Sequence, residues 1–174
     1  MKSLLATICI LGIVGMMIGT TAEALDYVTA TVTIGTVSVT VVPTSFDYGT
    51  IPFSDSKESF DTAGDLSGKN IKATVGTLVT DLDIKGAVTA GWTTLHATAP
   101  GVNTYVHKFG TSTNETTRPS SYTGLTTSFD DADKLAAAVA SEGSVWFGLN
   151  IYTPTSGVTA QQSAVVTLLA TWHE

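Results

Sequence analysis

The histidines are the side chains best suited to proton transfer or metal binding near neutral pH. The sequence has three of them, far apart, at His96, His107 and His173. No HExxH pattern, GxSxG nucleophile turn or glycine-rich phosphate loop accompanies them. His107 alternates with Tyr105 and Phe109, a spacing that favours a partly buried strand residue. The sequence therefore predicts no catalytic residue, no cofactor and no enzymatic activity.

Aspartates form three small clusters, and carboxylate oxygens are ligands that Ca²⁺ prefers. The clusters are Asp61 with Asp65, Asp81 with Asp83, and Asp130 and Asp131 with Asp133. The last cluster lacks the downstream Gly and Glu pattern of an EF-hand loop, and carboxylates also suit the first turn of a helix. We therefore expect a helix start at residues 130–133, solvated carboxylates elsewhere, and no metal site.

These side chains must be positioned by the rest of the chain, most of which shows the alternation of apolar and polar residues that is typical of β-strands. Apolar residues recur with period two over 71–75, 105–109 and 145–151. Residues 164–172 are apolar on both faces, which predicts a central strand. One short helix is expected over 130–143, because Asp130 can cap it, Leu135 and Val139 share a face, and Gly143 can end it.

These elements predict an all-β fold: an immunoglobulin-like Greek-key β-sandwich with one short helix and an N-terminal extension strand. The chain has 174 residues, 43% hydrophobic and 13% charged, which fits one domain and excludes a disordered chain. Its net charge of -7 disfavours nucleic acid as a partner. The single cysteine, Cys9, excludes an intrachain disulfide.

The first 24 residues have the pattern of a secretory signal peptide. A basic start at Lys2 precedes an apolar run from Leu4 to Ile18, and Ala22-Glu23-Ala24 fits the small-x-small cleavage rule. We expect cleavage after Ala24, a secreted protein at the cell surface or outside the cell, and no stable membrane span after processing. An uncleaved anchor is the alternative. The mature chain would contain no cysteine.

The segment that follows changes phase at a glycine. Thr29, Thr31 and Thr33 alternate with four apolar residues: Val28, Ala30, Val32 and Ile34. After Gly35 the apolar positions become 37, 39 and 41. Because a one-residue slip turns every side chain to the other face, one strand cannot bury both sets on one sheet. Either Gly35 marks a bulge within a strand of the same sandwich, or the two halves serve two sheets or two molecules.

The second alternative gives the sharper hypothesis. Residues 25–36 would be a donor-type strand with Gly35 as its hinge, and residues 37–174 the sandwich. Val28, Ala30, Val32 and Ile34 would enter a groove of another copy, as in β-strand addition. The partners would be copies of the same chain, joined into an extracellular filament or pilus.

Residues 43–52, Pro-Thr-Ser-Phe-Asp-Tyr-Gly-Thr-Ile-Pro, resemble the opening signature of abnormal-spindle/hydin-type immunoglobulin domains. The resemblance extends to Ile84, without the family's Asn-Thr-Gly turn, and implies a sandwich. The plan of a secretion signal, an alternating strand and a cysteine-free sandwich is similar to TasA/camelysin-like and archaeal bundling-pilus fibre subunits. That resemblance implies that an N-terminal strand completes the next subunit.

The alternative function is a monomeric cell-surface module that binds polysaccharide or protein. Trp146 and Tyr152 share one face of an expected strand, and Trp92 follows a glycine. Such aromatic rings could stack on sugars, or the loop over residues 110–128 could cover them as part of the packing. Asn114-Glu115-Thr116 in that loop is a candidate N-glycosylation site.

Overall fold

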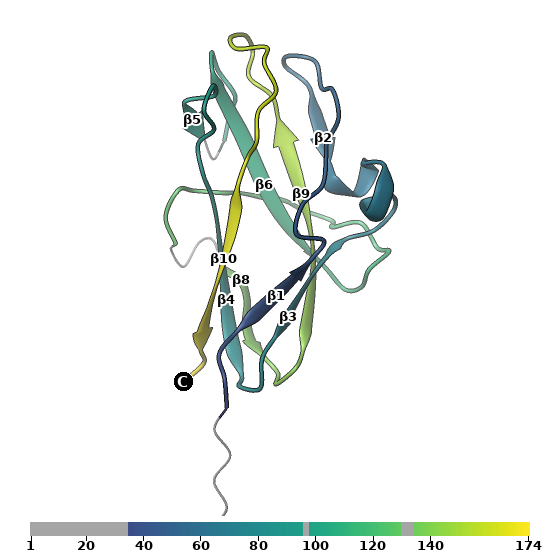
Figure 1. Ribbon diagram of the computed structural model, residues 1–174, viewed down its shortest axis with the longest axis vertical. Helices are drawn as coiled ribbons and strands as arrows, with labels where there is room; N and C mark the ends of the chain where they lie inside the picture. Colours follow the sequence, from purple (N-terminus) through teal and green to yellow (C-terminus); the bar gives the residue numbers. More distant parts are fainter. Residues whose placement is uncertain (1–34, 96–97, 130–133) are drawn as a thin grey trace, which may run out of the picture. The chain divides into compact units, whose positions relative to one another are not determined.

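The computed structural model describes residues 35–95, 98–129 and 134–174. These residues form two sheets with little helix, so the predicted all-β sandwich is confirmed (Figure 1). The larger sheet holds β1 (Val39–Val42), β2 (Ser56–Glu58), β3 (Ile71–Val75), β5 (Thr94–Leu95), β6 (Thr104–Ser112), β7 (Thr123–Gly124) and β9 (Ser144–Tyr152). The smaller sheet holds β4 (Thr80–Gly86), β8 (Lys134–Val139) and β10 (Val166–Trp172).

The strand order is that of an immunoglobulin-like sandwich. The main path of the larger sheet is β1-β3-β9-β6, joined by antiparallel pairs, and the smaller sheet is β10-β4-β8. A constant-type immunoglobulin sandwich has strands A-B-E-D in one sheet and C-F-G in the other. In chain order, β1, β3, β4, β6, β9 and β10 take the places of A to F, and β8 is added beside β4.

The core lies between the two sheets and follows the period-two patterns. On β4 the inward side chains of Leu82 and Ile84 are completely buried, and they face Ile71 and Ala73 of β3 and Phe147 of β9 in one hydrophobic cluster. Burying a leucine, isoleucine or phenylalanine side chain contributes about 1.5–3 kcal/mol. This cluster positions β4, the strand with which β10 pairs.

The predicted helix over residues 130–143 is wrong, because residues 134–139 form strand β8 along β4. Leu135 and Val139 do lie against the core. A spacing of four places two residues on one face of a helix, but it does the same in a strand, where every second residue shares a face. The pattern therefore could not distinguish the two. The structure has two short 3-10 helices elsewhere, η1 (Ser59–Asp61) and η2 (Gly64–Leu66).

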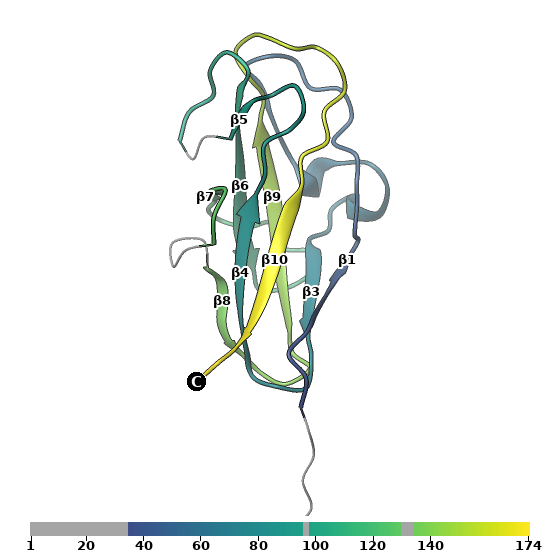
Figure 2. The same ribbon diagram turned by 60° about the vertical axis from the view of Figure 1, so that its left-hand side comes forward.

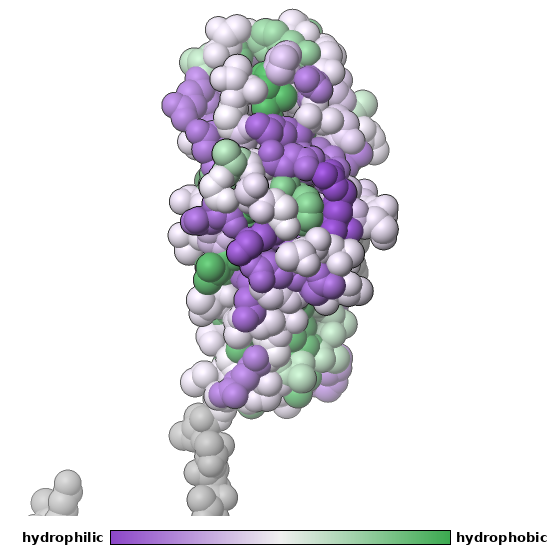
Figure 3. Space-filling view, turned by 90° about the vertical axis from the view of Figure 1, so that its right-hand side faces the viewer, coloured by the Kyte–Doolittle hydropathy of each residue, from purple (hydrophilic) through white to green (hydrophobic). Residues whose placement is uncertain are grey.

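The long loop after β6 covers part of the outer face of the larger sheet. Gly110 and Gly148 lie so close to Pro119 and Tyr122 that a Cβ at either glycine would crowd the loop. Arg118 pairs with Glu58 and Asp61 at 2.6 and 2.5 Å, which ties the loop to β2 and η1. The side of the molecule that carries β2 and the 3-10 helices is mainly hydrophilic across its middle (Figure 3).

Candidate functional site

β10 is an edge strand of the smaller sheet, but its many apolar residues are typical of an interior strand. β10 pairs with β4 along its whole length, from Val166 opposite Gly86 to Trp172 opposite Thr80. Within residues 35–95, 98–129 and 134–174 no strand pairs with its other edge. Among the described residues this strand is therefore an edge strand, and not the central strand that the sequence predicts. In the immunoglobulin order that vacant edge is the place of strand G.

The backbone groups at this free edge can be assigned from one hydrogen bond. The His173 N–H donates to the Val79 carbonyl at 3.1 Å, so the backbone of residue 173 faces β4. Because successive residues of a strand point their backbone groups to opposite sides, residues 167, 169 and 171 also face β4. The backbone groups that face away from β4, and that no described strand pairs with, belong to Val166, Leu168, Ala170 and Trp172. An added strand would bond to them.

The side chains of three of these residues point into the sandwich and are incompletely covered. Val166, Leu168 and Ala170 pack on the core but are only partly buried, and so are Val39 and Val41 on β1. The inward residues of β4, one strand further in, are completely buried. β1 and β10 run along the same side of the sandwich, one at the edge of each sheet (Figure 2). We call this side the open edge.

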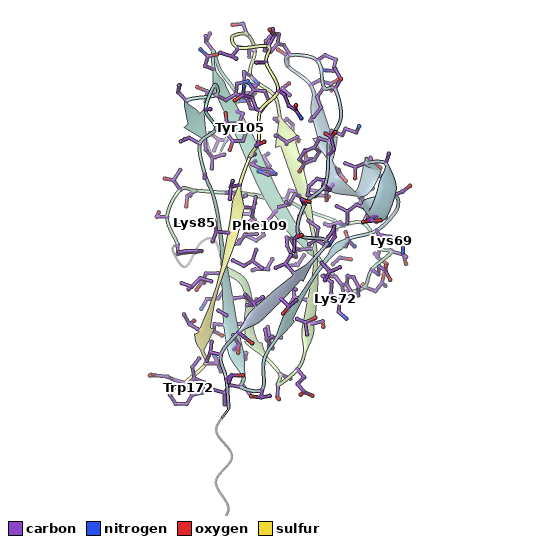
Figure 4. The ribbon with its side chains drawn as sticks, in the orientation of Figure 1. Lys69, Lys72, Lys85, Tyr105, Phe109 and Trp172 are labelled. Carbon is purple, nitrogen blue, oxygen red and sulfur yellow. The ribbon has the colours of Figure 1, made fainter. Side chains whose placement is uncertain are left out.

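Exposed apolar side chains also lie outside the core along and beside β10. Leu169 is 39% exposed, and Val165, just before the strand, is 57% exposed. Trp172 is 60% exposed and lies at the end of β10 near the C-terminus (Figure 4). Val165 and Leu169 are the residues that made the strand look central in the sequence. That excess of apolar residues is the sequence signal for this site, because an edge that pairs with a further strand needs the same apolar residues as a central strand.

The segment before β1 is held at one end of the sandwich. The Thr36 N–H donates to Thr77 Oγ1 at 2.8 Å, and the Gly76 N–H donates to the Ser38 carbonyl at 3.0 Å. A Cβ on Gly35 would lie 2.3 Å from Leu78 Cδ2, so only glycine fits there unless Leu78 moves. After Gly35, the apolar residues of the second alternating set pack on the core of the sandwich, with Val39 and Val41 pointing inward.

The predicted donor residues lie outside the part of the chain that the structure describes: Val28, Ala30, Val32 and Ile34. The expected signal peptide, His96 and the cluster at residues 130–133 lie outside it as well. Gly35 is described, and it lies against Leu78. The hinge itself stays a prediction.

The aromatic residues considered for sugar binding make contacts within the chain. Lys72 Nζ lies 5.5 Å from the centre of the Trp146 ring, and Lys108 Nζ lies 4.7 Å from that of Tyr152. Trp92 packs on Tyr105 with 5.4 Å between ring centres, and its Nε1–H donates to a backbone carbonyl. All three rings are partly buried, and sugar binding by them stays a prediction.

The remaining candidate residues are also placed. His107 is buried, Tyr48 Oη lies 3.0 Å from its Nε2, and burial lowers the pKa of this histidine to about 4. It is therefore a neutral core residue at pH 7. Asn114 is exposed, and its Oδ1 accepts the N–H groups of Thr116 and Thr117 in a tight turn. An exposed asparagine in such a loop is compatible with glycosylation, which stays a prediction.

Among the described residues there is no group of three or more His, Cys, Asp or Glu side chains that could hold a metal ion. Asp81 is instead used in the fold. Its carboxylate accepts the Ala138 N–H at 2.8 Å and lies 2.9 Å from His173 Nδ1 and 3.4 Å from Lys134 Nζ. No helix in the described part of the chain is long and apolar enough to span a membrane.

No protein-family model and no curated protein matches the chain. Among solved structures, the chain is similar to one described as the crystal structure of the P pilus rod subunit PapA. The identity is 12%, the match covers 86% of this chain and 100% of that one, and the TM-score is 0.43. A likeness this distant indicates nothing about function.

Proposed function

We propose that the protein is a secreted structural subunit that polymerises into an extracellular filament by donor-strand complementation. Residues 26–34 of one copy pair with the free edge of β10 in the next. The observation that carries this proposal is the open edge, where backbone groups of β10 and inward side chains of β10 and β1 lack a covering strand among the described residues.

The length and pattern of the N-terminal segment support the match. Nine extended residues span about 30 Å, and the seven residues of β10 span roughly 23 Å. The alternation of the segment would turn Val28, Ala30, Val32 and Ile34 toward the core and the three threonines outward. Each larger aliphatic side chain that becomes fully buried would contribute about 1.5–3 kcal/mol.

A strand added in this way would also stabilise a domain that has no disulfide. An unpaired, uncharged edge strand is prone to bind further strands, and β-strand addition satisfies its backbone groups. When each copy donates to a different copy, the contact is heterologous and the chain of subunits remains open. This geometry supports a polymer of identical subunits.

The test uses a mature chain that can accept a strand but not donate one. In the double variant Val32→Asp, Ile34→Asp, two charges would have to be buried for donation, whereas the open edge is unchanged. A synthetic peptide of residues 25–36 should bind this variant. At a concentration 100-fold above its Kd, it should stabilise the fold by about 2.7 kcal/mol and raise the Tm by about 5–10 °C.

The matched control is the same peptide with both aspartates, which should leave the Tm unchanged. Equal shifts with both peptides would mean that binding does not use the apolar face. Absence of binding by the unmodified peptide would contradict the proposal.

A further inference from the structure

The direction in which a donated strand enters the open edge decides what kind of assembly forms. This inference rests on the proposed function and adds the polarity of the strand.

The start of the described chain and the end of β10 lie at the same end of the sandwich. Residues 35–38 are held against the turn between β3 and β4 by the hydrogen bonds to Thr77 and Gly76. His173, directly after β10, bonds to Val79 next to the same turn. Figures 1 and 2 show the C-terminus and the start of β1 at this same end, which we call the turn end. β10 begins at Val166, further toward the opposite end.

Two directions of entry follow. A donor that enters a neighbour from the neighbour's turn end places Ile34 near Trp172, and the strand then runs parallel to β10. The two turn ends face each other in this arrangement, so the neighbour can return its own segment. Such a reciprocal exchange is isologous and closes a dimer. A return into the donor's own sandwich would have this same parallel direction.

A donor that enters from the opposite end places Ile34 near Val166 and runs antiparallel to β10. The turn end of one copy then faces the opposite end of the next, and each new copy leaves another open edge. This contact is heterologous and can continue. The free backbone groups of β10 can bond a strand in either direction, and an antiparallel pair forms straighter hydrogen bonds and is slightly more stable per residue.

We propose that the donated strand runs antiparallel to β10, so that consecutive subunits follow one another head to tail. The residues closest to Ile34 lie beside the start of β10, and those closest to Val28 lie nearer its end. The threonine face of the donor lies on the same outer surface as Thr167, Leu169 and Thr171.

Disulfide formation between pairs of introduced cysteines can determine the direction of the donated strand. The only native cysteine, Cys9, lies within the expected signal peptide, so the mature chain offers a background without thiols. Residues 167, 169 and 171 direct their backbone groups toward β4, so opposite an antiparallel donor they occupy non-hydrogen-bonded positions. Facing Cα atoms there are about 4.5 Å apart, within the range that a disulfide spans.

Double variants combine Thr29→Cys, Thr31→Cys or Thr33→Cys with Thr167→Cys, Leu169→Cys or Thr171→Cys in the mature chain. All six positions are on the expected outer face, so the core is unchanged. After mild oxidation, the antiparallel strand predicts covalent ladders on denaturing gels. The best partner on β10 should move to lower residue numbers as the donor number rises. Single-cysteine variants are the controls and should give at most disulfide-linked dimers.

The other outcomes separate the two proposals. Ladders in which the best partner rises with the donor number would overturn the antiparallel polarity but leave donor-strand complementation standing. Disulfides formed only within one chain would overturn both proposals. Intact polymers without a disulfide at any pair would show that the donated strand does not lie beside β10, and would also overturn the inference.

Discussion

The smaller sheet has two edges, and the chain treats them differently. At β8 the register with β4 shifts twice, and Ala138 has a φ of 50°, in the left-handed region. The Asp81 carboxylate takes the Ala138 N–H, and Lys134 adds a charge to the strand. Bulges and charges of this kind prevent an edge from pairing with another strand.

β10 has none of these protections. Its seven residues pair with β4 without a break, and the segment from Val166 to Trp172 contains no charge and no proline. Regular, apolar edges promote association, so proteins that must stay monomeric usually disrupt them. The difference between the two edges therefore indicates that β8 is a boundary of the fold and β10 is a surface for pairing.

The largest expected effect comes from a proline at the free edge. Ala170→Pro removes an N–H that points away from β4, which an edge strand can tolerate, and it removes a donor that an added strand requires. We expect the variant to fold and to lose polymer formation. Circular dichroism, thermal unfolding and electron microscopy measure the two properties.

The matched control is the adjacent residue. Leu169→Pro removes an N–H that faces β4, so it should instead destabilise the sandwich, by about 1–3 kcal/mol for the carbonyl left without a partner. If both variants unfolded equally, or if Ala170→Pro formed normal filaments, the assignment of the pairing edge would be wrong.

A smaller effect is expected at the protected edge. The hydrogen bond from the Ala138 N–H, with the nearby His173 and Lys134, lowers the pKa of Asp81. Ionised Asp81 therefore stabilises the fold at pH values above about 4, where a carboxyl group is ionised in the unfolded chain, and this contribution is lost as the pH falls through the lowered value. Asp81→Asn should lower the urea midpoint at pH 7, with a difference from the unmodified protein that shrinks in acid.

Polymer formation tests whether β8 is only a boundary. Since Asp81→Asn leaves β10 unchanged, filaments should form at the usual rate. A variant that gained a new mode of association through β8 would show that Asp81 protects that edge. A loss of filaments in a folded variant would contradict the distinction between the two edges.

Much of the fold could be predicted because burial imposes a period of two on residues such as Ile71, Ala73 and Phe147. Predictions from the sequence were wrong where one residue pattern is compatible with two structures. Leu135 and Val139 share a face in a helix and in a strand, and pairing with β4 decides between them. The apolar residues on both faces of 164–172 predict a central strand, although in the described sandwich the strand is an edge.

The phase break at Gly35 was visible in the sequence because period two is sensitive to a single inserted residue. Which phase enters the sandwich was not visible, and the structure answers this for Val39 and Val41. The acceptor residues of β10 could not be found from the sequence, because a free edge is a property of the whole sheet order. The alternation that marks a donor strand lies within one short segment, whereas an acceptor site depends on how strands that are far apart in the chain are ordered in the sheet.

The most direct test of the account is the mass of the purified mature protein, measured by size exclusion with light scattering. The account predicts a series of polymers built from units of about 15 kDa, the size of one domain. It also predicts that the Val32→Asp, Ile34→Asp variant is a folded monomer. A single 15 kDa species for the unmodified protein, together with unfolding when residues 25–34 are removed, would place the strand in its own sandwich and contradict the account.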